Sequence, residues 1–375
     1  MEQNKPYRVV VTGGGSGGHV MPLIAVAESL RSKLGPQTEF LYIGSKGKIE
    51  QDAMNGAGIP AVFILTGKMR RYFSVQNFAD FFKIPLGFMQ ALWYLLRYMP
   101  DAVFSKGGYV AVPVVLAAWM YRIPIVTQDS DAVPGMATRI LGKFADRVSV
   151  AYPTAMNYFP AGSVALIGNP VRSDVLSGDA AQARNLFNLD EAKPTILVLG
   201  GSLGARVIDK AIVTLLPKLL QETQVIHQTG EAHYAETVEL SKELGIEPDS
   251  HGYFPRAFLP MDELKHALAV ADLVVSRAGA NAIAEIAAVG KPAILIPLSS
   301  AANDEQRMNA YEIARVGGAL VLEDGNLGEN IFFNKITELL KDGELRGRMA
   351  QAIRVFYHPD AADAIANELI LLMRQ

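Results

Sequence analysis

Short apolar runs, each followed by a glycine-containing turn and a stretch with helical spacing, recur along the whole chain. Several runs are apolar at every position, which is typical of strands buried on both faces of a parallel sheet. Strands that alternate with helices in this way indicate an α/β fold. The runs predict strands at residues 8–12, 39–43, 61–65, 102–105, 123–127, 147–150 and 164–167, and then at 195–199, 224–228, 252–254, 273–276, 293–297 and 319–322.

Two segments of the chain carry nearly the same strand and turn. Residues 9–18 read VVVTGGGSGG and residues 196–205 read ILVLGGSLGA, so each apolar run enters Gly-Gly-Ser-x-Gly before a helix. A doubly wound sheet rarely begins twice, and the repeat therefore predicts two Rossmann-like domains. We expect them at residues 1–172 and 173–355, with a C-terminal helical segment, 356–375, that packs back on the N-terminal domain.

The composition excludes several classes of protein. Half of the 375 residues are apolar, and glycine and proline are spread out, which excludes a disordered or collagen-like chain. The formal net charge of −3 gives no overall attraction to nucleic acid, and the lack of cysteine rules out disulfides and thiolate metal sites. The N-terminus resembles no signal peptide, and no charge-poor stretch reaches the roughly 20 residues of a spanning helix, so we expect neither export nor a membrane span.

The first glycine-rich turn, residues 13–18, offers backbone N–H groups and the positive end of a helix to an anion. A phosphate-related site and a simple tight turn both fit it. A dinucleotide fingerprint and a P-loop do not, because no acidic residue ends the second strand and no Gly-Lys-Ser/Thr follows. His19 begins the next helix, whose dipole keeps the ring neutral, as a general base requires. The alternative is a histidine that only caps the helix.

The second half of the chain supplies a similar turn with Ser202, followed by another strand, turn and helix at residues 273–285. Glu285 stands among alanines on that helix, where a bare buried carboxylate costs several kcal/mol. Two vicinal ribose hydroxyls would satisfy it, and so would an internal arginine. Two phosphate cradles and a ribose ligand in one domain indicate a nucleotide donor.

Two further features each allow two interpretations. Asp129 and Asp131 follow a predicted strand and suit a divalent metal, but paired aspartates also form turns and no third ligand is evident, so we expect no metal. Residues 68–97 carry five basic residues against one acidic residue, with aromatic residues between them. That mixture suits an anionic membrane surface, whereas aromatic residues at helical spacing also form cores.

Taken in order, the motifs resemble the MurG family, the peptidoglycan glycosyltransferases of glycosyltransferase family 28. The resemblance covers nearly the whole chain and implies a GT-B fold, with two Rossmann-like parallel-sheet domains facing across a cleft. The motifs are Gly14-Gly15-Ser16-Gly17-Gly18-His19 with Pro22, Gly107-Gly108-Tyr109-Val110 with Pro113, Gly168-Asn169-Pro170-Val171-Arg172, Gly200-Gly201-Ser202-Leu203-Gly204-Ala205, Arg277-Ala278-Gly279 with Glu285, and Gln306 with Asn309.

The resemblance implies inverting transfer of GlcNAc from UDP-GlcNAc to the MurNAc 4-hydroxyl of undecaprenyl-pyrophosphoryl-MurNAc-pentapeptide (lipid I). The product, lipid II, serves peptidoglycan synthesis and hence cell shape and division. The N-terminal domain would take the acceptor and the membrane side, and the C-terminal domain the donor. We expect no tightly bound cofactor, no metal and no nucleic-acid partner. The expected location is the cytoplasmic face of the bacterial plasma membrane, where an anionic surface holds the protein peripherally.

The same resemblance assigns roles to single residues. His19 is the expected catalytic residue, and Ser16, Gly17 and Gly18 line the donor-sugar and acceptor side with it. The donor nucleotide is contacted by Arg172 and Ser202, the GlcNAc hydroxyls by Gln306, and the phosphates and ribose by Ala280, Asn281, Ala282, Ile283, Ala284 and Glu285.

Two positions depart from the family pattern. Asp131 replaces an asparagine that contacts the donor sugar, and Glu305 precedes Gln306 where a histidine is common. These departures affect substrate identity rather than reaction class. The alternatives to lipid II formation are a UDP-GlcNAc 2-epimerase-like enzyme, a GT-B transferase with a different lipid-linked acceptor, and a nucleotide-sugar-binding subunit without turnover.

Overall fold

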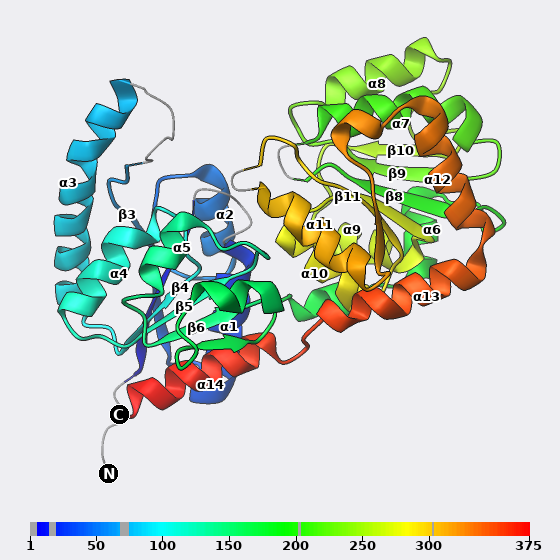
Figure 1. The fold of residues 1–375 in the computed structure, drawn as a ribbon. Coiled ribbons are helices and arrows are strands. Elements are labelled where there is room, and N and C mark those ends of the chain that lie inside the picture. The colour runs from blue at the N-terminus through cyan, green and yellow to red at the C-terminus, as the bar shows by residue number, and fades with distance from the viewer. Residues whose placement is uncertain (1–5, 15–19, 68–74, 202–203, 302–303) are drawn as a thin grey trace. The chain divides into compact units, whose positions relative to one another are not determined.

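The computed structural model describes residues 6–14, 20–67, 75–201, 204–301 and 304–375 (Figure 1). The chain divides into two compact units, the first comprising Met1–Arg172 with His358–Gln375 and the second Ser173–Tyr357. Each unit consists of a parallel β-sheet covered by helices. The predicted fold class, α/β with two Rossmann-like domains, is therefore confirmed.

The first unit is built on a sheet with the order β3-β2-β1-β4-β5-β6-β7. Alternate residues of β1 face opposite layers: Val9 and Val11 pack with α1 and α14, and Val10 packs with α3 and α4. The strands are β1 (Arg8–Thr12), β2 (Glu39–Gly44), β3 (Ala61–Phe63), β4 (Ala102–Ser105), β5 (Ile125–Asp129), β6 (Arg147–Val150) and β7 (Val164–Leu166). The helices are α1 (Val20–Leu34), α2 (Lys48–Gly56), α3 (Val75–Tyr98), α4 (Ala111–Met120), α5 (Met136–Leu141), α14 (Ala361–Met373) and a 3-10 helix at Pro153–Tyr158.

The second unit is built on a sheet with the order β10-β9-β8-β11-β12-β13. Its strands are β8 (Thr195–Leu199), β9 (Gln224–Gln228), β10 (Tyr253–Arg256), β11 (Leu273–Arg277), β12 (Ala293–Ile296) and β13 (Ala319–Val321). Its α-helices are α6 (Ala180–Phe187), α7 (Arg206–Leu219), α8 (Tyr234–Glu243), α9 (Met261–Val270), α10 (Ala280–Val289), α11 (Glu305–Arg315), α12 (Glu329–Lys341) and α13 (Gly343–Ile353), and its 3-10 helices are Ser173–Ser177, Asp324–Asn326 and Arg354–Phe356.

Every run predicted as a strand overlaps one, but several boundaries differ. The prediction of residues 123–127 for β5 is wrong by two residues at each end. The N–H of Ile123 bonds to the carbonyl of Ala118 at 2.9 Å, so Ile123 belongs to the turn after α4. At the other end, Gln128 and Asp129 continue the strand by pairing with β6. Polar residues therefore finish a strand that the apolar pattern ends too early.

The order of the strands reverses between β1 and β4 in the first sheet and between β8 and β11 in the second. In open parallel sheets, ligands bind outside the carboxyl ends of the strands at such a reversal. The two Gly-Gly-Ser turns follow β1 and β8, so each lies beside a reversal. Across the ranges that the structure describes, no helix combines the length and the apolar content needed to cross a membrane.

Candidate active site

Three segments of the second unit meet at the carboxyl edge of its sheet. Leu199 of β8 pairs with Ser276 of β11, and Arg277 of β11 pairs with Ile296 of β12, so the three strands end side by side. The Gly-Gly-Ser turn leads from β8 to α7, and the turn at 278–279 leads from β11 to α10. The N-termini of both helices therefore open on this edge, together with the segment between β12 and α11.

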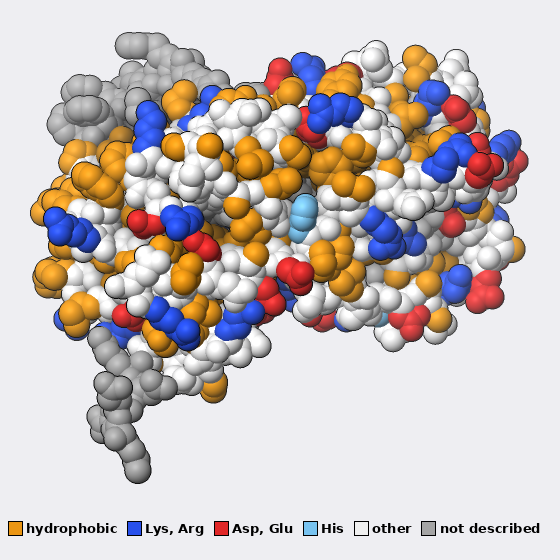
Figure 2. Space-filling model, turned by 60° about the horizontal axis from the view of Figure 1, so that its bottom comes forward, with side chains coloured by type: hydrophobic (Ala, Val, Ile, Leu, Met, Phe, Trp, Pro, Cys, Tyr) orange, Lys and Arg blue, Asp and Glu red, His pale blue; other side chains and the backbone are white. Residues whose placement is uncertain are grey.

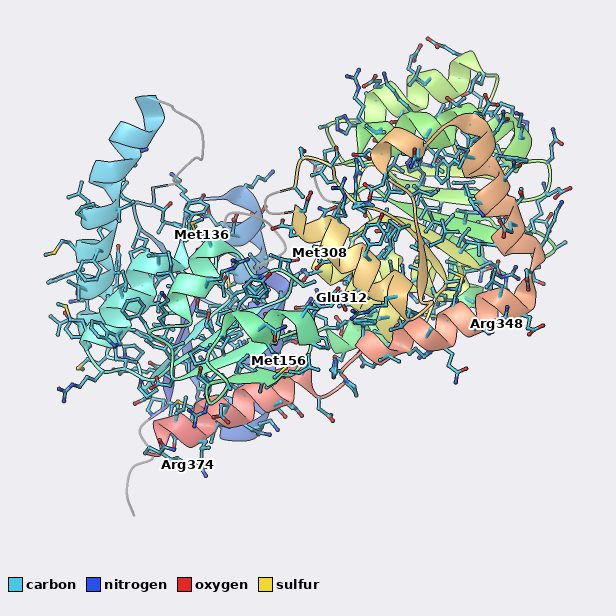
Figure 3. All side chains as sticks on the ribbon, in the orientation of Figure 1. Met136, Met156, Met308, Glu312, Arg348 and Arg374 are labelled. Atoms are coloured by element: carbon cyan, nitrogen blue, oxygen red, sulfur yellow. The ribbon has the colours of Figure 1, made fainter. Side chains whose placement is uncertain are left out.

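The predicted donor residues on α10 and α11 are part of this edge. Ala280, Asn281, Ala282, Ile283, Ala284 and Glu285 are the first six residues of α10, and Gln306 lies in the first turn of α11. The buried Asn309 donates from Nδ2 to the carbonyl of Ala278 at 3.3 Å, which fastens α11 to the turn after β11. The side-chain oxygen of Gln306 accepts from the backbone N–H of Leu298 at 3.0 Å. Figure 3 labels Met308 and Glu312 on the same helix.

Glu285 is half-buried, not enclosed as its alanine neighbours suggest. The desolvation cost that the sequence pattern indicates for a bare carboxylate therefore applies only in part. Its assignment to the ribose stays a prediction.

Arg277, the first residue of the Arg277-Ala278-Gly279 motif, forms hydrogen bonds that join neighbouring strand ends. Its Nη1 donates to Asp324 Oδ1 at 2.6 Å and to the carbonyls of Ile296 and Pro297, both at 3.2 Å. Asp324 Oδ2 accepts from the N–H of Ser299 at 3.3 Å and from its hydroxyl at 3.1 Å. The guanidinium group thus connects the ends of β11 and β12 with the 3-10 helix that follows β13.

The glycine turn after β8 is tied to the end of β9. The N–H of Gly200 donates to the carbonyl of Gln228 at 3.0 Å, and Gln228 Nε2 donates to the carbonyl of Gly201 at 3.4 Å. Gly204 has a φ of +80°, and a Cβ atom there would lie 2.3 Å from the carbonyl oxygen of Thr229. Only glycine fits this close approach, so the position of the turn is fixed by its backbone.

The candidate residues at the edge of the first unit lie around the end of β5. Asp129 Oδ1 accepts from the N–H of Asp131 at 2.9 Å, and its Oδ2 accepts from the N–H of Gly135 at 3.3 Å, so this carboxylate shapes the turn. Asp131 itself is half-buried. Within the described ranges, no three His, Asp or Glu side chains gather where they would hold a metal ion.

Sequence reasoning missed a lysine at this edge. Lys106 follows β4, is 4% exposed, and donates from Nζ to Ser130 Oγ at 2.6 Å. Ser130 in turn donates to Asn169 Oδ1. Burial lowers the pKa of Lys106, and the charges of Asp129 and Asp131 oppose that shift. The sequence signal that could have identified Lys106 is its position directly after the predicted strand 102–105, as the single charged residue in the run 102–118.

Of the remaining predicted residues, the structure describes Arg172. Arg172 is half-buried and ends the first segment of the first unit. Several predictions fall outside the described residues: Ser16, Gly17, Gly18, His19 and Ser202, and the basic residues Lys68, Arg70 and Arg71.

Comparison with known proteins gives concordant results for both units. Residues 9–150 match the glycosyltransferase family 28 N-terminal domain, and residues 195–365 match the glycosyltransferase family 28 C-terminal domain. A protein of Clostridium perfringens is 39% identical over 341 residues, which cover 91% of this chain and 92% of that protein. It is named UDP-N-acetylglucosamine--N-acetylmuramyl-(pentapeptide) pyrophosphoryl-undecaprenol N-acetylglucosamine transferase. A protein of the same name from Thermodesulfovibrio yellowstonii is 36% identical over 373 residues, 98% of this chain and 99% of that one.

Solved structures agree with these matches. The crystal structure of Acinetobacter baumannii MurG is similar with a TM-score of 0.73 and 26% identity, over 98% of this chain and 100% of that one. A UDP-N-acetylglucosamine 2-epimerase has a TM-score of 0.70 at 16% identity, over 98% of this chain and 96% of that one, a likeness of fold alone. The two family models together match most of the chain, and the relatives align with nearly all of it. The chain therefore belongs to glycosyltransferase family 28.

Proposed function

We propose that this protein is an inverting N-acetylglucosaminyltransferase. It moves GlcNAc from UDP-GlcNAc to the MurNAc 4-hydroxyl of lipid I and so forms lipid II for peptidoglycan synthesis. The observation that carries the proposal is the alignment, over nine-tenths or more of both chains, with relatives named for this reaction. The fold alone does not distinguish a transferase from an epimerase, because UDP-GlcNAc 2-epimerases share it at 14 and 16% identity.

The donor is assigned to the carboxyl edge of the second sheet. The N-termini of α7 and α10 open there beside each other, and helix N-termini favour the diphosphate of a nucleotide sugar. Ser202 would contribute a hydroxyl to this diphosphate, Glu285 would accept hydrogen bonds from the ribose, and Gln306 would contact the GlcNAc hydroxyls. Arg172 would contact the nucleotide. Backbone N–H groups can stabilise the departing UDP without requiring a metal ion.

The chemical step is assigned to the first unit. His19 would remove the proton of the acceptor hydroxyl while that oxygen attacks the anomeric carbon of GlcNAc. The bond between this carbon and the UDP oxygen breaks, UDP leaves with the bonding electrons, and the configuration inverts. His19 directly precedes α1 in the sequence, and a helix N-terminus favours the neutral imidazole that this role needs. Ser16, Gly17 and Gly18 would line the same side.

A membrane-docking surface is assigned to an apolar stripe on α3. Leu86, Met89, Trp93 and Leu96 recur at helical spacing, and each side chain is more than half exposed. Figure 2 shows hydrophobic side chains, with Lys and Arg side chains between them, on the first unit near the left margin of the view. Single exposed apolar residues are ordinary, but a contiguous stripe marks an interaction surface.

The end of α4 extends this stripe. The hydroxyl of Tyr121 donates to the carbonyl of Leu92 at 3.4 Å, which places the end of α4 beside α3. The preceding residues, Trp119 and Met120, are also more than half exposed. We call these residues and the stripe on α3 the α3–α4 apolar patch. It would insert at the headgroup level, where tryptophan is favoured.

Basic residues flank the patch. Arg97 and Arg122 are exposed, and Lys68, Arg70 and Arg71 precede α3 in the sequence. Each would add about 1 kcal/mol near an anionic surface, which is enough for reversible attachment when combined with apolar burial. Because the undecaprenyl chain of the acceptor stays in the bilayer, docking would bring the enzyme to its substrate. We therefore propose peripheral association with the cytoplasmic face of the plasma membrane.

The function is tested with purified protein, labelled UDP-GlcNAc and a lipid I analogue. Label in the lipid product, with UDP released only when acceptor is present, supports the proposal. Conversion of UDP-GlcNAc to its 2-epimer without acceptor would identify the epimerase alternative. Binding without any turnover would identify a nucleotide-sugar-binding subunit.

A further inference from the structure

One hydrogen bond decides which end of the Gln306 amide is left for a ligand. The backbone N–H of Leu298 can only donate, so the atom that meets it at 3.0 Å is the side-chain oxygen of Gln306. The NH2 group of the same amide makes no hydrogen bond to another residue that the structure describes, and the residue is half-buried. The amide therefore presents its two N–H donors to a ligand at this edge of the sheet.

The segment that carries Leu298 is held by a carboxylate in the 3-10 helix after β13. Asp324 Oδ2 accepts from the N–H of the next residue, Ser299, at 3.3 Å and from its hydroxyl at 3.1 Å. The other oxygen of Asp324 accepts from Arg277 Nη1 at 2.6 Å. The same nitrogen of Arg277 donates to the carbonyls of residues 296 and 297, both at 3.2 Å. Residues 296–299 therefore have a course that the arginine and the aspartate fix together.

The adjacent carboxylate holds the helix that carries Gln306. Glu323 accepts from Nε and Nη2 of Arg307, both at 3.1 Å, and from the hydroxyl of Tyr311 at 3.2 Å. Arg307 directly follows Gln306 on α11, and Tyr311 lies about one turn further along the same helix. The two partners of the Leu298–Gln306 hydrogen bond are thus each tied to one of two neighbouring carboxylates.

Of these two carboxylates, Asp324 is the one on which the orientation of the amide depends. The side chains of Arg307 and Glu323 are 40% and 25% exposed, and ion pairs in contact with water contribute little. The helix α11 is also fastened independently, by the bond from Asn309 to the turn after β11. In contrast, the side chains of Arg277 and Asp324 are only 11% and 15% exposed, so removing the aspartate leaves a largely buried guanidinium group unpaired.

We propose that Asp324 is a positioning residue for the sugar of the nucleotide-sugar donor and acts through Ser299, Leu298 and the amide of Gln306. The inference rests on the proposed function, in which Gln306 contacts the GlcNAc hydroxyls. With Asp324 in place, the NH2 group of Gln306 is already oriented when the donor arrives, so binding does not have to order it. Without Asp324, residues 298–299 lose their support and the amide can turn. The nucleotide part of the donor does not depend on this hydrogen-bond chain.

Calorimetry with UDP and with UDP-GlcNAc separates this role from a general structural one. In Asp324→Ala, Kd for UDP-GlcNAc rises by about 3- to 10-fold, the effect of one hydrogen bond between uncharged groups, whereas Kd for UDP stays within about twofold. Gln306→Ala gives the same pattern. The double variant binds UDP-GlcNAc within about twofold of Gln306→Ala, because the aspartate acts through the glutamine. The matched control is Glu329→Ala, which removes an exposed ion pair of 2.6 Å to Lys218 between α12 and α7 and changes neither Kd.

An equal rise in both dissociation constants would overturn the proposal, because a general loss of structure does not discriminate between the two ligands. Unchanged binding of both ligands, or effects of the two single variants that add in the double variant, would overturn it as well. Should Asp324→Ala fail to fold, Asp324→Asn gives the same selective rise, since one amide oxygen cannot serve both Arg277 and Ser299. The binding measurements need no turnover. A wild type that binds UDP-GlcNAc but transfers nothing to a lipid I analogue would therefore refute the proposed reaction, and the two dissociation constants would still decide the role of Asp324.

Discussion

The buried pair of His227 and Asp209 offers a quantitative test of how α7 is held against the sheet of the second unit. His227 Nε2 lies 3.1 Å from Asp209 Oδ1, and both side chains are almost completely buried. The other ring nitrogen lies 3.1 Å from the hydroxyl of Tyr253. Among the described residues, Asp209 Oδ2 is buried without a hydrogen-bond partner. The carboxylate in the first turn of α7 therefore depends on one imidazole.

Replacing His227 with leucine leaves the Asp209 carboxylate buried and unpaired. Breaking a buried pair in this way costs about 3–5 kcal/mol. For a domain of about 150–250 residues, 1 kcal/mol shifts Tm by about 2–4 °C, so Tm of the second unit falls by about 6–20 °C. The double variant His227→Leu/Asp209→Ala removes both polar groups at nearly unchanged total side-chain volume and recovers most of the loss, because apolar residues of similar volume often replace buried pairs without cost.

Differential scanning calorimetry without ligand measures these differences, with the transition of the first unit as the internal reference. The reasoning is refuted if Tm of His227→Leu lies within about 2 °C of the wild-type value. A shift that small corresponds to a loss of less than about 1 kcal/mol in the free energy of unfolding. The reasoning is equally refuted if the double variant is as unstable as the single one, since the loss would then come from packing and not from an unpaired carboxylate.

Four further predictions concern the candidate site, the α3–α4 apolar patch and the pH dependence of stability. Glu285→Ala weakens UDP binding by about 1–3 kcal/mol in calorimetry, the range for a lost charged hydrogen bond. His19→Ala lowers kcat by about 10²–10⁴-fold and leaves UDP-GlcNAc affinity nearly unchanged. Trp93→Ser with Leu96→Ser reduces sedimentation with anionic vesicles and slows transfer to a bilayer-embedded acceptor, while transfer to a soluble analogue is spared. Burial lowers the pKa of His358, so protonation of this side chain favours the unfolded chain. The free energy of unfolding therefore falls as pH drops below about 6.5 toward the folded-state pKa, and His358→Gln flattens this part of the pH profile.

Each of these predictions has a contrary outcome. Unchanged UDP affinity in Glu285→Ala removes the ribose assignment. Normal turnover with weakened donor binding in His19→Ala reassigns that residue to donor positioning. Leu371→Ser, at a half-exposed apolar residue on α14, is the control for docking, and an equal loss in this variant would refute the patch. An unchanged pH profile in His358→Gln would show that another group titrates there.

The fold was predictable because several of the buried parallel strands are continuous apolar runs. Val9–Val11 and the run at β8 read directly as strands, and the repeated Gly-Gly-Ser turn revealed two sheets. The end of β5 was not predictable in the same way, because Gln128 and Asp129 are polar and pair with β6 only in the folded sheet.

The candidate site was predictable where a motif is local and missed where partners are distant in sequence. Turns such as Gly200–Ala205 carry their own signal, since glycine permits the close approach seen at Gly204. Lys106 and Ser130 are 24 residues apart and belong to different strand ends, so only the sheet order brings them together. The pair of Asp209 and His227 is 18 residues apart and is likewise assembled by a β-α-β crossover.

The structure of the reaction product tests the central claim most directly. Purified protein, UDP-GlcNAc and a lipid I analogue are incubated, and the lipid product is analysed by NMR. The account predicts one added GlcNAc on the 4-hydroxyl of MurNAc, with the configuration at its anomeric carbon inverted from that of the donor. A product with retained configuration, or GlcNAc attached to any other group, would contradict it.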